Sequence, residues 1–326
     1  MEFGEPASFV ANTINGIAAP FIAFAAALLT FLAFWVQYQA NLHQRTAFVN
    51  EQEQRKKDEE GRDKLWQKER FETRFFELLK IHRTNVDQMD VAGKIKGRKL
   101  FIHFYREFRY IYLWTELHEK ALRKEKKIKR KTNLVEFSYK IFFYGIGINS
   151  EKHYLPDLDT STKELFERIK PRLEACQEKY LEGQKSTIDR GLQIYDKPLA
   201  TSADEYTLEM YFYPFDGYLN HLGHYYRHLY RTVQFVIKNK ILELSEKVEY
   251  MEILRAQLSD FEQLLLYYNA RAWFPEKWKI PFRDYQLIHN IPTDLATLGG
   301  TIFDYYRKEI NELKMENKEP MFYDTK

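Results

Sequence analysis

The hydrophobic residues of this chain are unbroken in one N-terminal segment and periodic in most of the rest. Residues 6–42 contain no charged side chain, and residues 17–36 are almost continuously apolar. Because a helix rises about 1.5 Å per residue, this run spans ~30 Å as a helix, the thickness of a bilayer's hydrocarbon core. The pattern therefore predicts a transmembrane helix within an anchor formed by residues 1–40.

Individual side chains of this segment agree with an anchor. Aromatic rings at one end, including Tyr38, suit the membrane interface. We expect Pro20 to lie in the first turn of the helix, where proline costs little. A cleaved signal peptide would place basic residues ahead of its apolar core, but the residues before this run include Glu2 and Glu5 and no Lys or Arg. The residues that we expect to mark the anchor are Ile17, Pro20, Phe24, Leu28 and Trp35.

The basic residues nearest the apolar run lie on its C-terminal side. Arg45, Arg55, Lys56 and Lys57 follow the run, and none precedes it. Basic residues next to a span favour the cytoplasmic side. We therefore expect a single-pass protein of the inner (cytoplasmic) membrane, in contact with lipid, with its C-terminal domain in the cytoplasm.

Residues 41–70 are rich in Gln, Glu, Lys and Arg, which have good helix propensity. Few positions are apolar, and a helix that is polar all round is solvated. We interpret this segment as a charged helical stalk. The alternative is a short coiled coil that forms a homo-oligomer, with Tyr38, Leu42 and Val49 as its seam.

Residues 71–318 have the apolar spacing of helices, and alternation typical of strands does not persist. We predict an all-α fold, with helices near residues 71–89, 97–124, 218–242 and 250–273. The apolar positions that we expect to be buried include Phe75, Phe104, Phe108, Leu229, Leu265 and Tyr268.

Two middle segments, residues 145–161 and 186–206, look irregular and bound a predicted helix near residues 162–182. Residues 319–326 form a tail. Between these elements, residues 123–131 hold seven basic side chains and one acidic one. Such a run could contact nucleic acid or anionic lipid, but it is more often a solvated helix end.

Composition excludes several classes of protein. The net charge is only +3, so no global attraction to nucleic acid is implied, and one cysteine excludes an internal disulfide framework. Phosphate-binding loops, nucleophile elbows and zinc-protease motifs are absent from the sequence. His221, His224 and His228 could share a helix face, but no acidic or thiol ligand accompanies them. We expect no metal and no cofactor, and whether the chain is an enzyme stays open.

One spacing suggests a nuclease. Arg98 and His103 resemble the Arg–His spacing of HEPN ribonucleases, which carry both residues on a helix of an all-helical fold. The spacing recurs at Arg283 and His289, and the frequencies of the two residue types produce such matches by chance. Arg98 and His103 are the catalytic pair of this alternative.

The stretch LGHYYRHLYRTVQFV, residues 222–236, combines an apolar stripe with a polar face. Leu222, Tyr226 and Val233 belong to the stripe, whereas Arg227 and His228 belong to the polar face. A later segment, residues 253–269, carries a second polar set that includes Glu262. Either the two helices pair their polar residues across an interface, or these residues form a binding site.

These two segments, GHYYRHLYRTVQFV and ILRAQLSDFEQLLLYYN, resemble the paired signature of the phage abortive infection proteins of the AbiC type. The upstream segments FETRFFELLKIHRTNVDQM and GRKLFIHFYREF agree with the resemblance. The residues that match the signature are Gly223, His224, Arg227, Tyr230, Arg255, Gln257 and Asn269. The functional cluster that we expect consists of His224, Arg227, His228, Tyr230, Arg255, Gln257 and Asn269.

The resemblance implies a bacterial anti-phage role in which infection triggers growth arrest or death of the cell, without assigning a catalytic set. It implies that Arg227 and Arg255 bind an anion or a carboxylate, with His224 as the titratable member. We therefore expect a membrane-anchored defence protein that senses infection, through a phage protein or nucleic acid, or carries out growth arrest. The alternatives are a membrane-tethered HEPN-like ribonuclease and a structural membrane adaptor.

Overall fold

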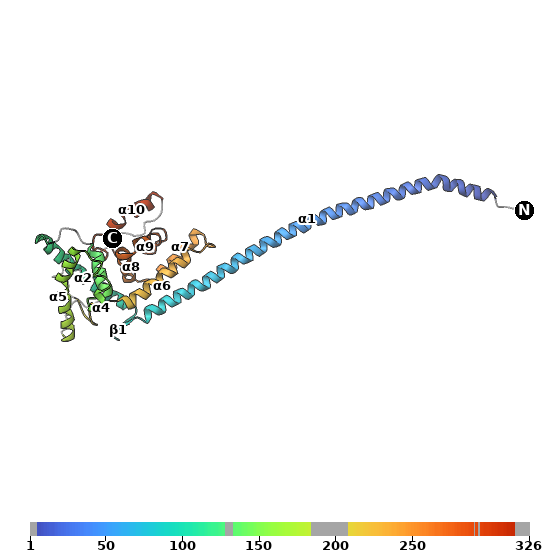
Figure 1. Cartoon of the computed structure of the whole chain (residues 1–326). Helices are drawn as coiled ribbons and strands as arrows, with labels where there is room; N and C mark the ends of the chain where they lie inside the picture. The colour runs from blue at the N-terminus through green and yellow to red at the C-terminus, as the bar shows by residue number, and fades with distance from the viewer. Residues whose placement is uncertain (1–4, 128–132, 184–207, 290, 293, 317–326) are drawn as a thin grey trace. The chain divides into compact units, whose positions relative to one another are not determined.

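The computed structural model describes residues 5–127, 133–183, 208–289, 291–292 and 294–316 (Figure 1). The chain divides into two compact units, Met1–Glu69 and Arg70–Lys326. We call the second unit the body. The irregular segment predicted at residues 186–206 and the tail lie outside the described residues, as does the end of the basic run.

Helix α1 (Glu5–Asp87) includes residues of both units (Figure 1). It contains the one segment, among the described residues, that is long and apolar enough to cross a membrane, and none of that apolar window is buried. Pro20 lies inside α1 rather than in a first turn, because the helix begins at Glu5. The expected place of this proline was therefore wrong, and one backbone hydrogen bond of α1 is lost there.

The body is helical, which confirms the all-α prediction. A hairpin of two-residue strands, β1 (Asp90–Val91) and β2 (Ile95–Lys96), pairs antiparallel after α1. The other helices of the described chain are α2 (Lys99–Lys124), α3 (Leu134–Tyr144), α4 (Ile148–Glu151), α5 (Thr160–Leu181), α6 (Leu219–Ile237), α7 (Leu244–Arg255), α8 (Asp260–Trp273), α9 (Pro275–Arg283) and α10 (Ile302–Met315).

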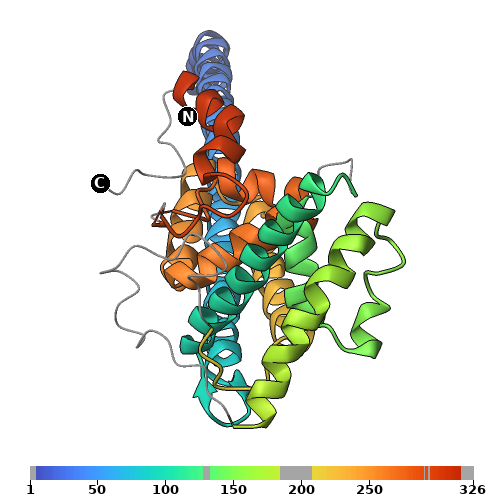
Figure 2. The same cartoon turned by 90° about the vertical axis from the view of Figure 1, so that its left-hand side faces the viewer.

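Helix α2 is central to the packing of the body. It contacts α3, α5 and α8, and Figure 2 shows it crossing the middle of the body between α5 and the C-terminal helices. The predicted apolar stripes face this core, since Phe104 and Phe108 of α2 are fully buried, as are Leu229 of α6 and Tyr268 of α8. Close ring contacts, such as 5.0 Å between the Phe108 and Tyr268 centroids, fill the interior.

The predicted helix over residues 250–273 is two helices. Helix α7 ends at Arg255 and α8 begins at Asp260, because Ser259 and Glu262 form a capping box. The Ser259 hydroxyl accepts a bond from the Glu262 amide, while the Glu262 carboxylate accepts one from the Ser259 amide. This exchange starts α8 at Asp260, and a short turn at residues 256–259 separates it from α7.

A close backbone crossing places the start of α6. The Tyr218 amide donates to the Phe143 carbonyl at 2.9 Å, and the Ile146 amide donates to the Phe215 carbonyl at 3.1 Å. Gly145 and Gly217 both have positive φ angles, and a Cβ at Gly217 would lie 2.4 Å from the Tyr144 carbonyl. Only glycine fits this crossing.

Candidate functional site

Glu262, in the first turn of α8, is the centre of a polar network inside the body. Its side chain is fully buried. One carboxylate oxygen accepts bonds from the Ser259 amide at 2.8 Å and hydroxyl at 2.7 Å, and the other accepts from the Tyr225 hydroxyl at 3.2 Å. Burial raises the pKa of Glu262, while these donors act in the opposite direction.

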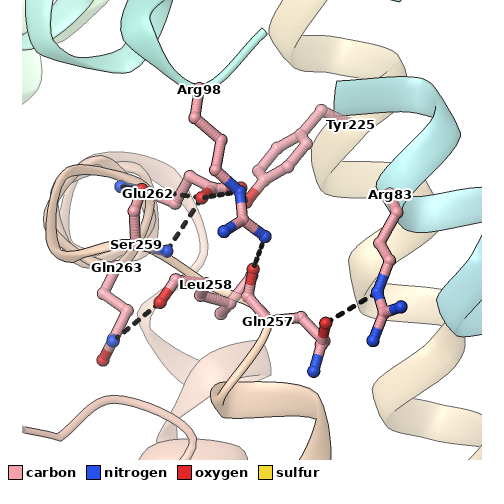
Figure 3. Close-up of polar contacts among 8 residues, drawn as sticks. All are labelled: Arg83, Arg98, Tyr225, Gln257, Leu258, Ser259, Glu262 and Gln263. Atoms are coloured by element: carbon pink, nitrogen blue, oxygen red, sulfur yellow. Dashed lines mark hydrogen bonds and ion pairs between the residues drawn. The ribbon is translucent and has the colours of Figure 1, made fainter. Parts of the chain in front are cut away.

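Arg98, the residue that precedes α2, extends its side chain toward Glu262. Its Nε atom lies 3.7 Å from Glu262 Oε2, and its Nη2 atom donates to the Gln257 carbonyl at 2.6 Å. The side chain of Arg98 is 49% exposed, so the guanidinium group reaches both the buried carboxylate and solvent. Figure 3 shows it between Glu262 and the turn that joins α7 to α8.

Two further contacts hold this turn. Arg83 of α1 donates from Nε to Gln257 Oε1 at 2.7 Å (Figure 3). Gln263 donates to the Leu258 carbonyl at 3.4 Å and accepts from the His289 amide at 2.9 Å. Side chains of α1, of α8 and of the residue that precedes α2 therefore hold the turn. We call the following residues the Glu262 network: Arg83, Arg98, Tyr225, Gln257, Ser259, Glu262 and Gln263.

Two imidazole rings lie beside the Glu262 network. His82 of α1 is 1% exposed, and its ring centroid lies 5.3 Å from that of Tyr225 and 6.1 Å from that of His228. His82 Nε2, both ring nitrogens of His228 and Asn85 Nδ2 are buried without a hydrogen-bond partner in the described structure. Unmet polar groups at this density are unusual in a folded interior and mark a place that can accept a polar group.

Both rings are neutral at neutral pH. Burial lowers the pKa of His82 to about 4, and the neighbouring His228, Arg98 and Arg83 add to the shift. Burial also lowers the pKa of His228, with a further contribution from His224. Neutral imidazoles can each donate or accept a hydrogen bond. The cationic charge of the site therefore comes from the two arginines.

The residues predicted on α6 divide between surface and interior. His224 and Arg227 are exposed, and Tyr230 is half-buried with its ring 5.3 Å from that of Trp278. The interface between α6 and α8 is bridged by Tyr225 and Glu262. Polar residues therefore do pair across that interface, but the partner on α6 is Tyr225, which was not among the predicted residues.

The residues predicted after α6 also separate. Gln257 belongs to the Glu262 network, whereas Arg255 donates to the Gln286 carbonyl at 2.7 Å and lies 3.7 Å from Glu252. Asn269 is 2% exposed and hydrogen-bonds the Tyr139 hydroxyl in the core. Only His228 and Gln257 of the predicted cluster therefore lie at or beside this network.

Arg98 and His103 both line a pocket of ≈ 830 Å³ beside the β1–β2 hairpin. Burial and the nearby Arg106 lower the pKa of His103 to about 4, and its ring stands edge-on to Tyr211 at 4.9 Å. Three lysines share the lining, so the pocket is cationic. Its polar lining residues are Asp87, Lys94, Lys96, Arg98, Lys99, His103 and Tyr211.

The sequence held signals for the residues that were not predicted as site residues. His82 follows Phe75 and Leu79 at helical spacing, which places an imidazole on the buried face of α1. Glu262 follows Ser259 by three positions, the spacing of a capping box. No group of three or more His, Cys, Asp or Glu side chains suited to a metal occurs among the described residues.

The comparisons with known proteins agree with the paired-helix signature. The family model described as putative phage abortive infection protein matches residues 217–295, about a quarter of the chain. No curated protein and no solved structure matches the chain. The resemblance to the AbiC-type family is thereby confirmed over the segment that contains Tyr225, Gln257 and Glu262.

Proposed function

We propose that this chain is a membrane-anchored anti-phage defence protein whose helical body responds to infection through the Glu262 network. The observation that carries the proposal is the match of residues 217–295 to the abortive infection family. That segment supplies Glu262, Tyr225 and the α7–α8 turn, whereas Arg83 and Arg98 of the network lie outside it.

The contacts of the turn suggest how a trigger acts. Arg83 and Arg98 hold Gln257 through neutral oxygen atoms, and both guanidinium groups reach solvent. Charge-assisted bonds to a carboxylate or phosphate are stronger than bonds to neutral acceptors. An acidic group of a phage protein or nucleic acid would therefore compete with Gln257 for the two arginines and release the turn.

Phage plaquing on cells that express the full chain tests this mechanism. Because the double substitution Arg83→Gln/Arg98→Gln frees the turn without a trigger, we expect it to arrest the growth of uninfected cells and to lose infection-dependent protection, while the membrane fraction stays unchanged. Arg74→Gln is the matched control, because Arg74 is an exposed arginine of α1 that pairs only with Glu77 at 2.9 Å in the described structure. Full protection by the double variant would refute a role for the Glu262 network.

The apolar part of α1 is the basis of the proposed anchor. Phe24 and Leu28 are exposed there, and a charge at the centre of a bilayer costs about 3 kcal/mol. We expect Phe24→Arg/Leu28→Arg to leave the membrane fraction and to lose protection. Phe48→Arg/Val49→Arg, at exposed apolar positions beyond the apolar run, should remain in the membrane.

Orientation and assembly are part of the same proposal. We place the body in the cytoplasm, where protease added to inverted membrane vesicles, but not to right-side-out cells, should digest it. Homo-oligomerisation through residues 41–70 would appear as a cross-linked dimer that Leu42→Lys/Val49→Lys abolishes. A monomer in the membrane would refute the assembly and leave the anchor intact.

RNA cleavage is the second candidate function, favoured by the shared pocket of Arg98 and His103. Lysines of this pocket would bind phosphates, and a neutral His103 imidazole could accept a proton from a ribose hydroxyl. We expect purified full-length protein to cleave RNA in this case, and His103→Gln to stop it. His118→Gln, on the same helix, is the control, and absence of cleavage by the unaltered protein would exclude the candidate.

A further inference from the structure

A second pocket of ≈ 710 Å³ lies between α2, the first turn of α3, the last turn of α8 and the loop at residues 297–300. It shares no lining residue with the Glu262 network or with the pocket of His103. Ligand pockets for small molecules have volumes of about 300–1,000 Å³. The space therefore suits a molecule of nucleotide size.

Helix α2 contributes a stripe of polar side chains to this pocket. Arg109, Tyr112 and Glu116 follow one another at i, i+3 and i+7, so they face the same side of the helix. Arg109 is 3% exposed and hydrogen-bonds the Tyr105 hydroxyl. The residues that carry the guanidinium group and the carboxylate, Arg109 and Glu116, are seven positions apart, which is ~10 Å along the helix axis.

Arg271, in the last turn of α8, contributes a second guanidinium group. It donates to the carbonyls of Leu298 at 2.9 Å and Gly299 at 2.5 Å, and to the Tyr267 hydroxyl at 3.1 Å. The ring of Tyr305 lies 4.6 Å from its central carbon. These partners are all neutral, so they orient the guanidinium group without cancelling its charge.

The glycine loop fits closely around Arg271. Gly299 has a φ of +72°, and a Cβ there would lie 2.4 Å from Val135 Cγ2 and 2.9 Å from Arg271 Nη2. Gly300 also has a positive φ, but its Cβ would meet nothing within 4 Å. The loop can approach Arg271 only because residue 299 lacks a side chain, which fixes the guanidinium group at the pocket.

The first turn of α3 adds a weaker preference of the pocket for anions. Asn133, Leu134 and Val135 line the pocket, and α3 has 11 residues. The start of a helix carries a partial positive charge, which favours a phosphate. Leu113, Leu134 and Leu298 supply apolar surface beside these charges.

We propose that this pocket binds a phosphate-bearing small molecule of nucleotide size. Its phosphate would meet Arg109 and Arg271, and the Glu116 carboxylate would accept hydrogen bonds from hydroxyl or amino groups at the other end. The Glu116 side chain is 31% exposed, and its carboxylate lies 3.3 Å from Lys120 Nζ. Two fixed guanidinium groups disfavour a metal cation or a purely apolar ligand.

Calorimetric titration of the purified full chain in detergent tests the proposal, with ATP, GTP, adenosine and inorganic phosphate as probes. We expect ATP or GTP to bind at least ~10-fold more tightly than adenosine or phosphate alone, because only a nucleotide contacts both ends. If neither ATP nor GTP binds, the proposal is wrong, whether or not an RNA pentanucleotide binds.

Variants locate the binding. Arg271→Gln should weaken nucleotide binding by about 10-fold or more. Glu116→Gln should weaken nucleotide binding but tighten inorganic phosphate, because it removes both an acceptor and a repulsive charge. These opposite signs require the carboxylate to act inside the pocket. Unchanged affinities in both variants would overturn the assignment.

The two glycines give a matched control for folding. Gly299→Ala and Gly300→Ala impose a similar backbone strain, but only the first displaces Arg271. We expect nucleotide binding to weaken in Gly299→Ala and to persist in Gly300→Ala, with both melting temperatures recorded. Equal losses of binding in two folded variants would contradict the proposal. The titration needs no phage, so its outcome is independent of the proposed defence role.

Discussion

The Glu262 carboxylate, fully buried, lies 3.7 Å from the Nε atom of Arg98, a side chain that is half exposed. This contact joins the start of α8 to the start of α2. A buried carboxylate is costly unless it is hydrogen-bonded, and Ser259 and Tyr225 supply the bonds. A change at the exposed side of Arg98 therefore alters the surroundings of the buried carboxylate that caps α8.

The first prediction concerns how much the Glu262 carboxylate contributes to the stability of the fold. Glu262→Ala removes the acceptor of the Ser259 amide and of the buried Tyr225 hydroxyl, and should lower the free energy of unfolding by about 3 kcal/mol. Urea unfolding in detergent measures this. Glu246→Ala removes the capping box that Glu246 forms with the exposed Glu243 before α7. It should lower the free energy of unfolding by only about 1 kcal/mol. Equal costs would contradict the burial argument.

The helices were predictable from the sequence because their apolar stripes are continuous. Leu222, Leu229 and Val233 repeat at helical spacing, and all three are buried on α6. The break between α7 and α8 was missed because Leu254, Leu258 and Phe261 carry the same spacing across the turn. Only the capping pair Ser259 and Glu262 distinguishes the two cases.

The partners within the site were not predictable in the same way. Arg98 and Gln257 stand 159 positions apart, and no local pattern specifies that their atoms meet. The predicted cluster followed the polar face of α6, which includes the exposed His224 and Arg227. The network instead uses Tyr225, whose hydroxyl extends from the apolar face to Glu262, because tyrosine combines an apolar ring with a polar tip.

A second prediction follows from the burial of Glu107. Burial raises its pKa to about 8, although the Tyr218 hydroxyl at 2.6 Å and the Phe215 amide at 3.1 Å partly oppose the shift. Between about pH 4.5 and 8 the folded protein holds a proton that the unfolded chain has released. The free energy of unfolding should therefore fall as pH rises, by at most about 1.4 kcal/mol per pH unit.

Glu107→Gln isolates this contribution, because glutamine is similar in shape to the protonated carboxyl group. We expect the variant to lose most of the pH dependence between pH 5 and 8 and to be more stable than the unaltered protein at pH 8. Unfolding measured at pH 5, 6.5 and 8 gives the slope. The same slope in both proteins would show that Glu107 is ionised in the fold.

A third prediction concerns the acid side and His82. With a pKa of about 4 in the fold, His82 stays neutral while the unfolded chain binds a proton below about pH 6.5. The free energy of unfolding should therefore fall as pH decreases from 6.5 to 4. His82→Leu removes the part of this dependence that His82 contributes, and at pH 7 it should change stability by less than about 1 kcal/mol, because Nε2 has no partner to lose.

Melting temperatures at pH 4.5 and 7 measure the effect of His82→Leu. His153→Leu, which replaces an exposed histidine, is the control. A variant whose melting temperature falls as steeply with acid as that of the unaltered protein would show that His82 already binds a proton in the fold.

The last prediction tests the backbone crossing that places the start of α6. Gly217→Ala adds a Cβ 2.4 Å from the Tyr144 carbonyl at a φ of +87°, so strain and collision act together and should cost about 3 kcal/mol or more. Gly183→Ala, at a φ of +74° with nothing within 4 Å, carries only the strain and should cost about 1 kcal/mol. Urea unfolding of both variants compares them. If they lose the same stability, the crossing yields without cost, and residues 145 and 217 do not fix the position of α6.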